Sequence, residues 1–336
     1  MINRINIERP QLMASRFLLP LVLMVASAGG LLCSGGCDTQ AESSGASRSS
    51  QKPQVVATTT MIGDLVRQIA GDRVELKVLM PPGVDPHTFK PSTADLGNIQ
   101  RANLVLYNGL HLEGKMVDLL EHELGDRAVA VTRDIPQELL LPWKQTGGAS
   151  GGGAHDPHVW FDASLWARAA KTVCDALIRL DPQGAETYTR NYQQLKAELD
   201  ALHAEIKQKL AEIPRQRRVL ITSHDAYNYF GRAYDIEVFG LQGISTETEA
   251  GLTNINNAVD FILQRKIPAI FVESSVSPKT IQRVQADCKA RGFDVKIGGE
   301  LYSDAMGAPG EHPGYAVETY AGMVRYNVDT IVKALK

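Results

Sequence analysis

The sequence predicts an α/β protein of two lobes, each a mainly parallel four-stranded sheet flanked by helices, joined by one long rigid helix. Two observations carry this prediction. Short apolar β-type runs alternate with helical segments from residue 54, and the alternation resumes after a long amphipathic segment at 181–213. Such alternation is typical of parallel sheets covered by helices. We therefore expect lobes at 54–180 and 214–336, with the ligand site in the cleft between them.

The N-terminal lobe contains four predicted strands, separated by helices. The strands are 55–57, 74–79, 104–107 and 128–131, and the helices are 61–70, 93–101, 115–123 and 164–180. In the first helix, apolar residues recur at helical spacing from Ile62 to Ile69. The Gly-rich stretch TGGASGGGA at 146–154 predicts a flexible insert before the last helix.

A long helix is expected to connect the lobes. Asp181-Pro182 predicts its start, with Asp as N-cap and Pro at the first helical position. Apolar and aromatic residues recur along it in steps of three and four: Tyr188, Tyr192, Leu195, Leu199, Leu202, Ile206 and Leu210. At ~1.5 Å per residue it would span roughly 45 Å, about two stacked domains. A coiled coil with a partner is the alternative, but fewer than about five heptads within a mixed chain favour an intramolecular strut.

The C-terminal lobe repeats the pattern of strands and helices. Its predicted strands are 219–222, 236–239, 269–272 and 295–297, and its helices are 227–233, 255–266, 280–291 and 315–335.

The N-terminus has the features of an export signal. Basic residues precede an apolar run at 17–28, which is short for a membrane span, and small residues follow up to Cys37. We therefore interpret 1–37 as a lipoprotein-like signal peptide with Cys37 as the acylated residue, although translation could also start at Met13 rather than Met1. The polar segment 38–53 predicts a flexible tether.

Charge and cysteine content exclude other classes. The net charge is −3, so nucleic acid is not an expected partner. Cys174 and Cys288 fall in different predicted lobes, and we expect buried thiols rather than a disulfide.

Three histidines and one aspartate are candidate metal ligands. His87 and His158 each end an Asp-Pro-His tripeptide, and His224 and Asp304 each follow a predicted strand of the C-terminal lobe. Proline restricts its own φ and extends the preceding residue, which stiffens the loop that carries the imidazole. Each lobe would contribute two ligands. The set suits tetrahedral zinc, or manganese if the carboxylate binds through both oxygens.

Six segments resemble one family of metal receptors. They are DPHTF at 85–89, NGLHLEGKM at 108–116, DPHVWFD at 156–162, ITSHDAYNYFGRAYDIEVFGLQGISTETE at 221–249, PAIFVESSVSPKT at 268–280 and IGGELYSDAMG at 297–307. These segments resemble the zinc and manganese solute-binding proteins of ABC transporters, cluster A-I, also called the adhesin-type lipoproteins. The resemblance extends over nearly all of residues 54–336.

The resemblance implies a ligand set and leaves the metal open. His87, His158, His224 and Asp304 match the ligand positions of the family. Many manganese receptors have Glu at the third position, so this His-His-His-Asp set is similar to the Tro-type receptors, which are associated with both metals. Dedicated zinc receptors often carry a long His- and acid-rich loop before the second histidine, where this chain adds only His155.

The resemblance also implies a transport role and no enzymatic activity. We expect an exported, periplasmic or extracytoplasmic, lipid-anchored monomer. It would capture Zn²⁺ or Mn²⁺ as transported substrate and deliver it to a cognate ABC permease and ATPase. For release, we expect the transporter to displace one ligand, with Asp304 as the candidate. The adhesin label leaves a secondary role in cell adhesion open.

The remaining polar residues receive supporting roles. Asp225 and Glu273 are candidates for orienting a ligand by hydrogen bonds. We expect His111 to be structural, His122 and His203 to face solvent, His155 to be an auxiliary ligand at most, and His312 to lie on the surface.

Two alternative functions use similar residues. A zinc hydrolase would keep one coordination position open for water and hold a general base nearby, but the sequence has no HExxH, Gly-x-Ser-x-Gly or phosphate-loop motif. A receptor for a haem or siderophore chelate would share the two-lobe architecture, and stoichiometric binding of free metal ion would exclude it.

Overall fold

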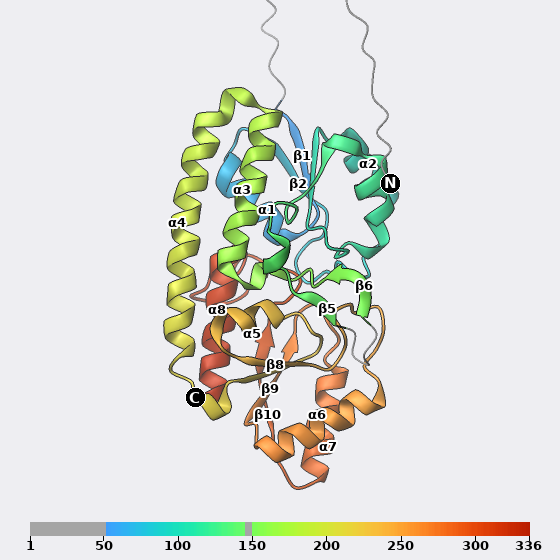
Figure 1. Cartoon of the computed structure of the whole chain (residues 1–336), viewed down its shortest axis with the longest axis vertical. Coiled ribbons are helices and arrows are strands. Elements are labelled where there is room, and N and C mark those ends of the chain that lie inside the picture. The colour runs from blue at the N-terminus through green and yellow to red at the C-terminus, as the bar shows by residue number, and fades with distance from the viewer. Residues whose placement is uncertain (1–51, 145–149) are drawn as a thin grey trace, which may run out of the picture. The chain divides into compact units, whose positions relative to one another are not determined.

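The computed structural model describes residues 52–144 and 150–336, shown in Figure 1. The predicted signal peptide 1–37, with Cys37, and nearly all of the tether 38–53 lie outside the described residues. Within the described ranges, no helix combines the length and apolar character needed to cross a membrane.

The first lobe is built on a parallel four-stranded sheet in the order β2-β1-β3-β4. The strands are β1 (Gln54–Ala57), β2 (Glu75–Val78), β3 (Leu104–Tyr107) and β4 (Ala128–Ala130). Side chains alternate between its two faces, as strand geometry requires. Val55 packs into the main core with α1 (Thr60–Ala70) and α3 (Ala163–Leu180), whereas Val56 packs on the other face with α2 (Thr93–Arg101).

Two segments of this lobe differ from the prediction. The expected helix 115–123 consists of a 3₁₀ turn, Gly114–Met116, and a π-helical segment, Leu119–Glu123. Of the insert expected to be flexible, residues 146–149 lie outside the described residues, and the rest belongs to β6 (Ser150–His155), which pairs antiparallel with β5 (Pro142–Lys144).

The connecting helix is shorter than expected at its start. Asp181 does not cap it; a 3₁₀ turn, Pro182–Gly184, precedes α4 (Ala185–Leu210). The Asp181 carboxylate instead accepts hydrogen bonds from Arg73 at 2.7 Å and from the Tyr188 hydroxyl at 2.7 Å. Figure 1 shows α4 running beside α3 and beside α8 (Tyr320–Leu335), so one helix packs against both lobes.

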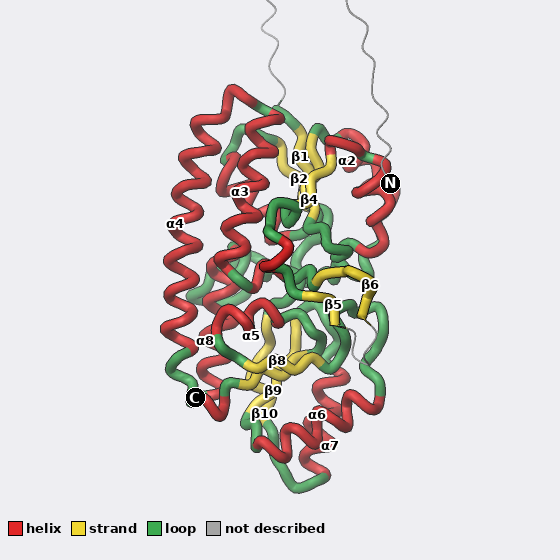
Figure 2. The backbone as a smooth tube through the Cα atoms, viewed as in Figure 1, coloured by secondary structure: helices red, strands yellow, loops and turns green. Residues whose placement is uncertain are grey.

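The second lobe contains four strands in two parallel pairs. β7 (Val219–Thr222) pairs with β8 (Glu237–Gly240), and β9 (Ala269–Glu273) pairs with β10 (Lys296–Leu301). β7 contacts β9, and Figure 2 shows β8, β9 and β10 gathered in this lobe, but the described strands do not form the single continuous ladder that we expected. The helices of this lobe are α5 (Asn228–Tyr234), α6 (Leu252–Arg265), α7 (Lys279–Ala290) and α8. The predicted α/β class with parallel strands, flanking helices and one long helix is confirmed.

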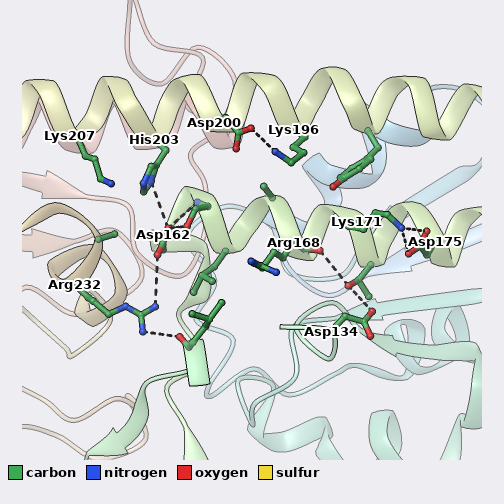
Figure 3. A pocket seen from close by; sticks show the side chains of 17 residues that line it. Asp134, Asp162, Arg168, Lys171, Asp175, Lys196, Asp200, His203, Lys207 and Arg232 are labelled. Atoms are coloured by element: carbon green, nitrogen blue, oxygen red, sulfur yellow. Dashed lines mark hydrogen bonds and ion pairs between the residues drawn. The ribbon is translucent and has the colours of Figure 1, made fainter. Parts of the chain in front are cut away.

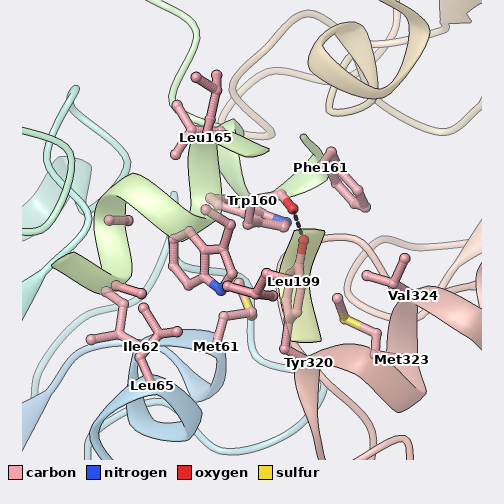
Figure 4. Close-up of a cluster of buried hydrophobic side chains, with 14 of the residues drawn as sticks. Met61, Ile62, Leu65, Trp160, Phe161, Leu165, Leu199, Tyr320, Met323 and Val324 are labelled. Atoms are coloured by element: carbon pink, nitrogen blue, oxygen red, sulfur yellow. Dashed lines mark hydrogen bonds between the residues drawn. The ribbon is translucent and has the colours of Figure 1, made fainter. Parts of the chain in front are cut away.

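One apolar core continues from the first lobe into the second. Figure 4 shows Met61 of α1, Leu199 of α4 and Met323 of α8 in the same buried cluster. Trp160 is buried in this cluster: its indole N–H donates to the Ser303 carbonyl at 3.0 Å, and its own carbonyl accepts from the Tyr320 hydroxyl at 2.7 Å. A large rotation of one lobe would expose this core to water, at about 25 cal/mol per Å² of apolar surface. The fold therefore favours small movements of loops at the cleft.

The described residues all belong to one compact unit. The proposed domain boundaries at 54–180, 181–213 and 214–336 remain a prediction.

Candidate metal centre

The structure brings the four predicted ligands together between the lobes. His87 lies in the loop after β2, and His158 directly precedes the 3₁₀ turn Val159–Phe161. His224 follows β7, and Asp304 follows β10. All four are buried, at most 2% exposed, and one donor atom of each lies within 4.8 Å of the others.

The distances between the donor atoms agree with a single coordinated ion. His158 Nε2 lies 3.2 Å from His87 Nε2 and 3.4 Å from His224 Nε2. Asp304 Oδ1 lies 3.5 Å from His158 Nε2, and its Oδ2 lies 3.4 Å from His224 Nε2. A tetrahedral ion with bonds of about 2.05 Å separates its ligand atoms by about 3.3 Å. These four spacings therefore fit a zinc-sized ion, and the remaining donor pairs lie within 4.8 Å.

Both Asp-Pro-His tripeptides form the same local turn. Asp85 Oδ1 accepts the His87 backbone N–H at 2.8 Å, and Asp156 Oδ1 accepts the His158 N–H at 3.0 Å. Asp156 also reaches the imidazole, with Oδ1 at 2.7 Å from His158 Nδ1. A carboxylate on Nδ1 keeps the proton there, so that the lone pair of Nε2 faces the centre. Our sequence analysis missed Asp156, although the repeated tripeptide was the signal for it.

Glu273 holds His224 in the corresponding way. Its Oε2 lies 2.6 Å from His224 Nδ1, and its Oε1 accepts the His224 backbone N–H at 2.9 Å. The expected supporting contact of Glu273 is therefore present in the geometry. Asp225 lies elsewhere: its carboxyl interacts with Asn228, and its backbone N–H donates to the Gly243 carbonyl.

Asp304 is buried with one oxygen free of protein donors. Ser275 Oγ lies 3.4 Å from Oδ2, whereas Oδ1 has no hydrogen-bond partner among the described residues. A buried, unpartnered carboxylate oxygen is costly unless a cation compensates it. The orientation of Asp304 therefore favours an ion at the point where the three imidazoles converge.

Burial and neighbouring charges set the pKa values of the ion-free site. Burial lowers the pKa of His87 to about 3, so its ring is neutral and can offer a lone pair. Burial also disfavours charge on His224, but the Glu273 and Asp304 carboxylates outweigh it and raise its pKa well above 6.5. Burial would raise the pKa of Asp304, yet His224 and the other imidazoles hold it below its ordinary range. The carboxylates thus favour positive charge at the centre.

A buried turn of the first lobe is hydrogen-bonded to the residue that precedes His158. Glu113 accepts the Thr58 hydroxyl at 2.7 Å and the Asn108 backbone N–H at 2.7 Å. The Asn108 side-chain amide then donates to the Pro157 carbonyl at 3.0 Å, next to His158. His111 lies on this turn with φ at 62°, which agrees with a structural role. No periodicity in the sequence indicated the role of Glu113.

The other histidines lie outside the cluster. His122 is exposed, as expected, and His155 is partly buried, with no hydrogen-bond partner for its Nδ1 among the described residues. His203 does not face solvent freely, because its Nδ1 lies 3.1 Å from the Tyr234 hydroxyl. His312 is only partly exposed and stacks on Tyr326, with ring centroids 4.1 Å apart. Cys174 and Cys288 are both buried and free thiols in this structure.

A large surface cavity lies away from the cluster and contains none of its residues. It measures about 950 Å³ and lies along α3 and α4 (Figure 3). Its charges are largely paired within each helix, as in Lys171–Asp175 and Lys196–Asp200. Such exposed pairs contribute little free energy and do not indicate a ligand.

Comparisons with known proteins agree with this geometry. The family model described as zinc-uptake complex component A, periplasmic, matches residues 55–334. Zinc-binding protein TroA of Treponema pallidum (strain Nichols) is 46% identical over 285 residues, which cover 84% of this chain and 89% of that protein. Manganese-binding lipoprotein MntA of Bacillus subtilis (strain 168) is 43% identical over 303 residues, which cover 90% of this chain and 94% of that protein.

A solved structure, the periplasmic zinc binding protein TroA from Treponema pallidum, superposes with a TM-score of 0.78 at 45% identity and covers 84% of this chain and 99% of that one. The family is a substrate-binding component of metal transport, which agrees with the expected binding protein rather than an enzyme. Because the family model spans nearly all of the described residues and both relatives match most of the chain, this chain belongs to the family of the periplasmic zinc-uptake complex component A.

Proposed function

We propose that this chain is the extracytoplasmic solute-binding component of an ABC importer, and that His87, His158, His224 and Asp304 hold Zn²⁺ or Mn²⁺ as its transported substrate. The observation that carries the proposal is the convergence of four buried donor atoms within 4.8 Å. Imidazole lone pairs facing one another at 3.2 and 3.4 Å need a proton or a cation between them. A divalent cation satisfies all four donors at once.

The choice between the two ions follows from the Asp304 carboxylate. If it binds through one oxygen, the site is tetrahedral and suits zinc. If both oxygens bind, a five-coordinate site results, which manganese accepts more readily. Both oxygens face imidazole nitrogens, at 3.5 and 3.4 Å, and the two relatives named above carry a zinc-binding and a manganese-binding description. These observations support both ions as substrates.

The geometry argues against both alternative functions. Four protein ligands complete a tetrahedral shell, whereas a hydrolase needs an open position for water. A haem or siderophore cannot enter between donor atoms that already lie 3.2–3.5 Å apart in a buried cluster. The continuous core between the lobes also restricts the opening that a large chelate would require.

The cellular arrangement follows from the role of the family. The binding component delivers its ion to a permease that is driven by an ATPase, on the outer side of the cell membrane. Acylation at Cys37 would tether the protein there, as the description of the Bacillus relative as a lipoprotein supports. We propose a monomer, because all four donors come from one chain. Mass spectrometry of the mature N-terminus and light scattering test these two points.

Metal analysis and competitive titration test the function itself. Protein purified without added metal is expected to hold Zn²⁺ or Mn²⁺ in a 1:1 ratio. His87→Ala, His158→Ala and His224→Ala should each weaken binding by more than about 100-fold, because each opens a completed shell. His122→Ala, which removes an exposed histidine, is the matched control and should bind like the wild type. Unchanged affinity in all three ligand variants would refute the site.

A further inference from the structure

The four proposed ligands are not held equally tightly. The rings of His158 and His224 are each fixed by a carboxylate on Nδ1, at 2.7 and 2.6 Å. In the described part of the chain, no side chain hydrogen-bonds the corresponding nitrogen of His87. Only the His87 backbone N–H is fixed, by Asp85 at 2.8 Å. The position of the His87 ring therefore depends on its loop.

A hydroxyl of the opposite lobe binds the loop that carries His87. Asp85 Oδ2 accepts from Thr88 Oγ1 at 3.0 Å and from Thr246 Oγ1 at 2.5 Å. Thr246 lies between β8 and α6, in the second lobe, whereas Asp85 lies after β2 in the first. One carboxylate thus links the backbone of a ligand residue to a side chain across the cleft.

The residue after Thr246 contacts the same region. Glu247 forms an ion pair with Lys115, and a Cβ added at Gly114 would lie 3.4 Å from the His87 carbonyl and 4.0 Å from Glu247 Oε1. The segment around Thr246 and Glu247 therefore lies against the turn behind His87. Both partners of the ion pair are more than 40% exposed, so this pair contributes little free energy to holding the two lobes together. The hydrogen bond from Thr246 is the stronger of the two ties.

The His87 loop begins with exposed residues and contacts a core cluster through the partly buried Val84 and Phe89, whereas the Asp304 loop is buried. Pro81, Pro82 and Gly83 are exposed, and Gly83 has φ at 76°, a conformation that glycine adopts at low cost. By contrast, the residues around Asp304 are buried, and the Met306 backbone N–H donates to Thr60 Oγ1 at 2.8 Å. This contrast argues against Asp304 as the first ligand to be displaced.

We propose that Thr246 is a positioning residue for His87: its hydroxyl, bonded to Asp85, latches the His87 loop, and the ion enters and leaves on the His87 side when this latch opens. The inference rests on the proposed function and adds the route of exchange. The latch controls the rate at which the ion leaves, and the four-ligand geometry stays the same while the latch is closed.

The rate of metal dissociation tests the latch, measured by stopped flow with excess chelator. Thr246→Val keeps the shape of the side chain but removes its hydroxyl, and it is expected to accelerate dissociation roughly 10-fold, the effect of losing a hydrogen bond to a charged group. Thr246→Ser restores the hydroxyl and should return the rate to within about 2-fold of the wild type. Thr253→Val, the same substitution at an exposed position of α6, should leave the rate unchanged.

Two further readouts separate positioning from loss of structure. The absorption spectrum of the Co²⁺-loaded Thr246→Val variant should match that of the wild type, because the same four ligands bind. Lys115→Ala should change the rate less than about 2-fold, since the exposed pair is weak. A wild-type dissociation rate in Thr246→Val, or a Thr246→Ser rate as fast as that of Thr246→Val, would overturn the latch while the proposed function stands. A wild-type protein that binds no metal would overturn both.

Discussion

Replacing Glu273 by glutamine tests how a buried carboxylate prepares His224 for metal binding. Both of its oxygens are used: Oε1 accepts the His224 backbone N–H at 2.9 Å, and Oε2 lies 2.6 Å from Nδ1. Glutamine has a single acceptor oxygen. If its NH₂ group faces Nδ1, the ring proton must move to Nε2, which blocks the metal-binding nitrogen. If the NH₂ group faces the backbone, two donors meet in a fully buried place.

Asp156→Asn is the matched comparison. Asp156 uses a single oxygen, Oδ1, for both the backbone N–H of His158 at 3.0 Å and its Nδ1 at 2.7 Å. The amide oxygen of asparagine can take over both bonds, and its NH₂ group then replaces Oδ2, which accepts from Asn228 at 3.0 Å. Removing a partner of a metal-bound histidine costs 10- to 100-fold in affinity. We therefore expect about 100-fold for Glu273→Gln, roughly 2.7 kcal/mol, and about 10-fold or less for Asp156→Asn.

Competition against a chromophoric chelator at fixed pH measures these affinities, with circular dichroism to show that both variants are folded. Zn²⁺ and Mn²⁺ should give the same order, because the effect acts on the histidine and not on the ion. A Glu273→Gln affinity within about 3-fold of the wild type would refute the role of the second oxygen. So would an Asp156→Asn variant that loses more affinity than Glu273→Gln.

Three further predictions concern proton release on metal binding, thermal stability and the buried turn around Glu113. Zn²⁺ binding near pH 7 should release about one proton, because the raised pKa of His224 keeps it protonated in the ion-free protein. The affinity for Zn²⁺ should therefore fall about tenfold for each unit by which the pH drops. Calorimetry in buffers of different ionisation enthalpy measures the number of protons released. Free ion at about 1,000 times Kd should stabilise the fold by about 4 kcal/mol and raise Tm on the order of 8 °C in scanning calorimetry, and EDTA should reverse the shift. Glu113→Ala should lower the free energy of unfolding in urea by about 3 kcal/mol, because the Thr58 hydroxyl and the Asn108 N–H lose their buried acceptor; a loss under about 1 kcal/mol would contradict this.

Local patterns in the sequence located most secondary structure well. The predicted helix 93–101 and strand 104–107 match α2 and β3 residue for residue, because Ser92 caps the helix and an unbroken apolar run marks the buried strand. The last helix was predicted five residues too early. It begins at Tyr320, where the Thr319 side chain caps the helix by accepting the Gly322 N–H at 3.1 Å.

The sequence by itself determined the alternation of strands and helices and the four side chains proposed as ligands, since both follow from the residue types and their positions after strands and turns. Only the tertiary structure decided which groups support them. His224 meets Glu273 across 49 residues of chain, and Asp85 meets Thr246 across 161. No sequence period links such partners, because their meeting depends on how the strands align and how the lobes pack. Distances of 2.5 to 3.5 Å between side chains are set by that packing, whereas the sequence specifies only which chemical groups are available to it.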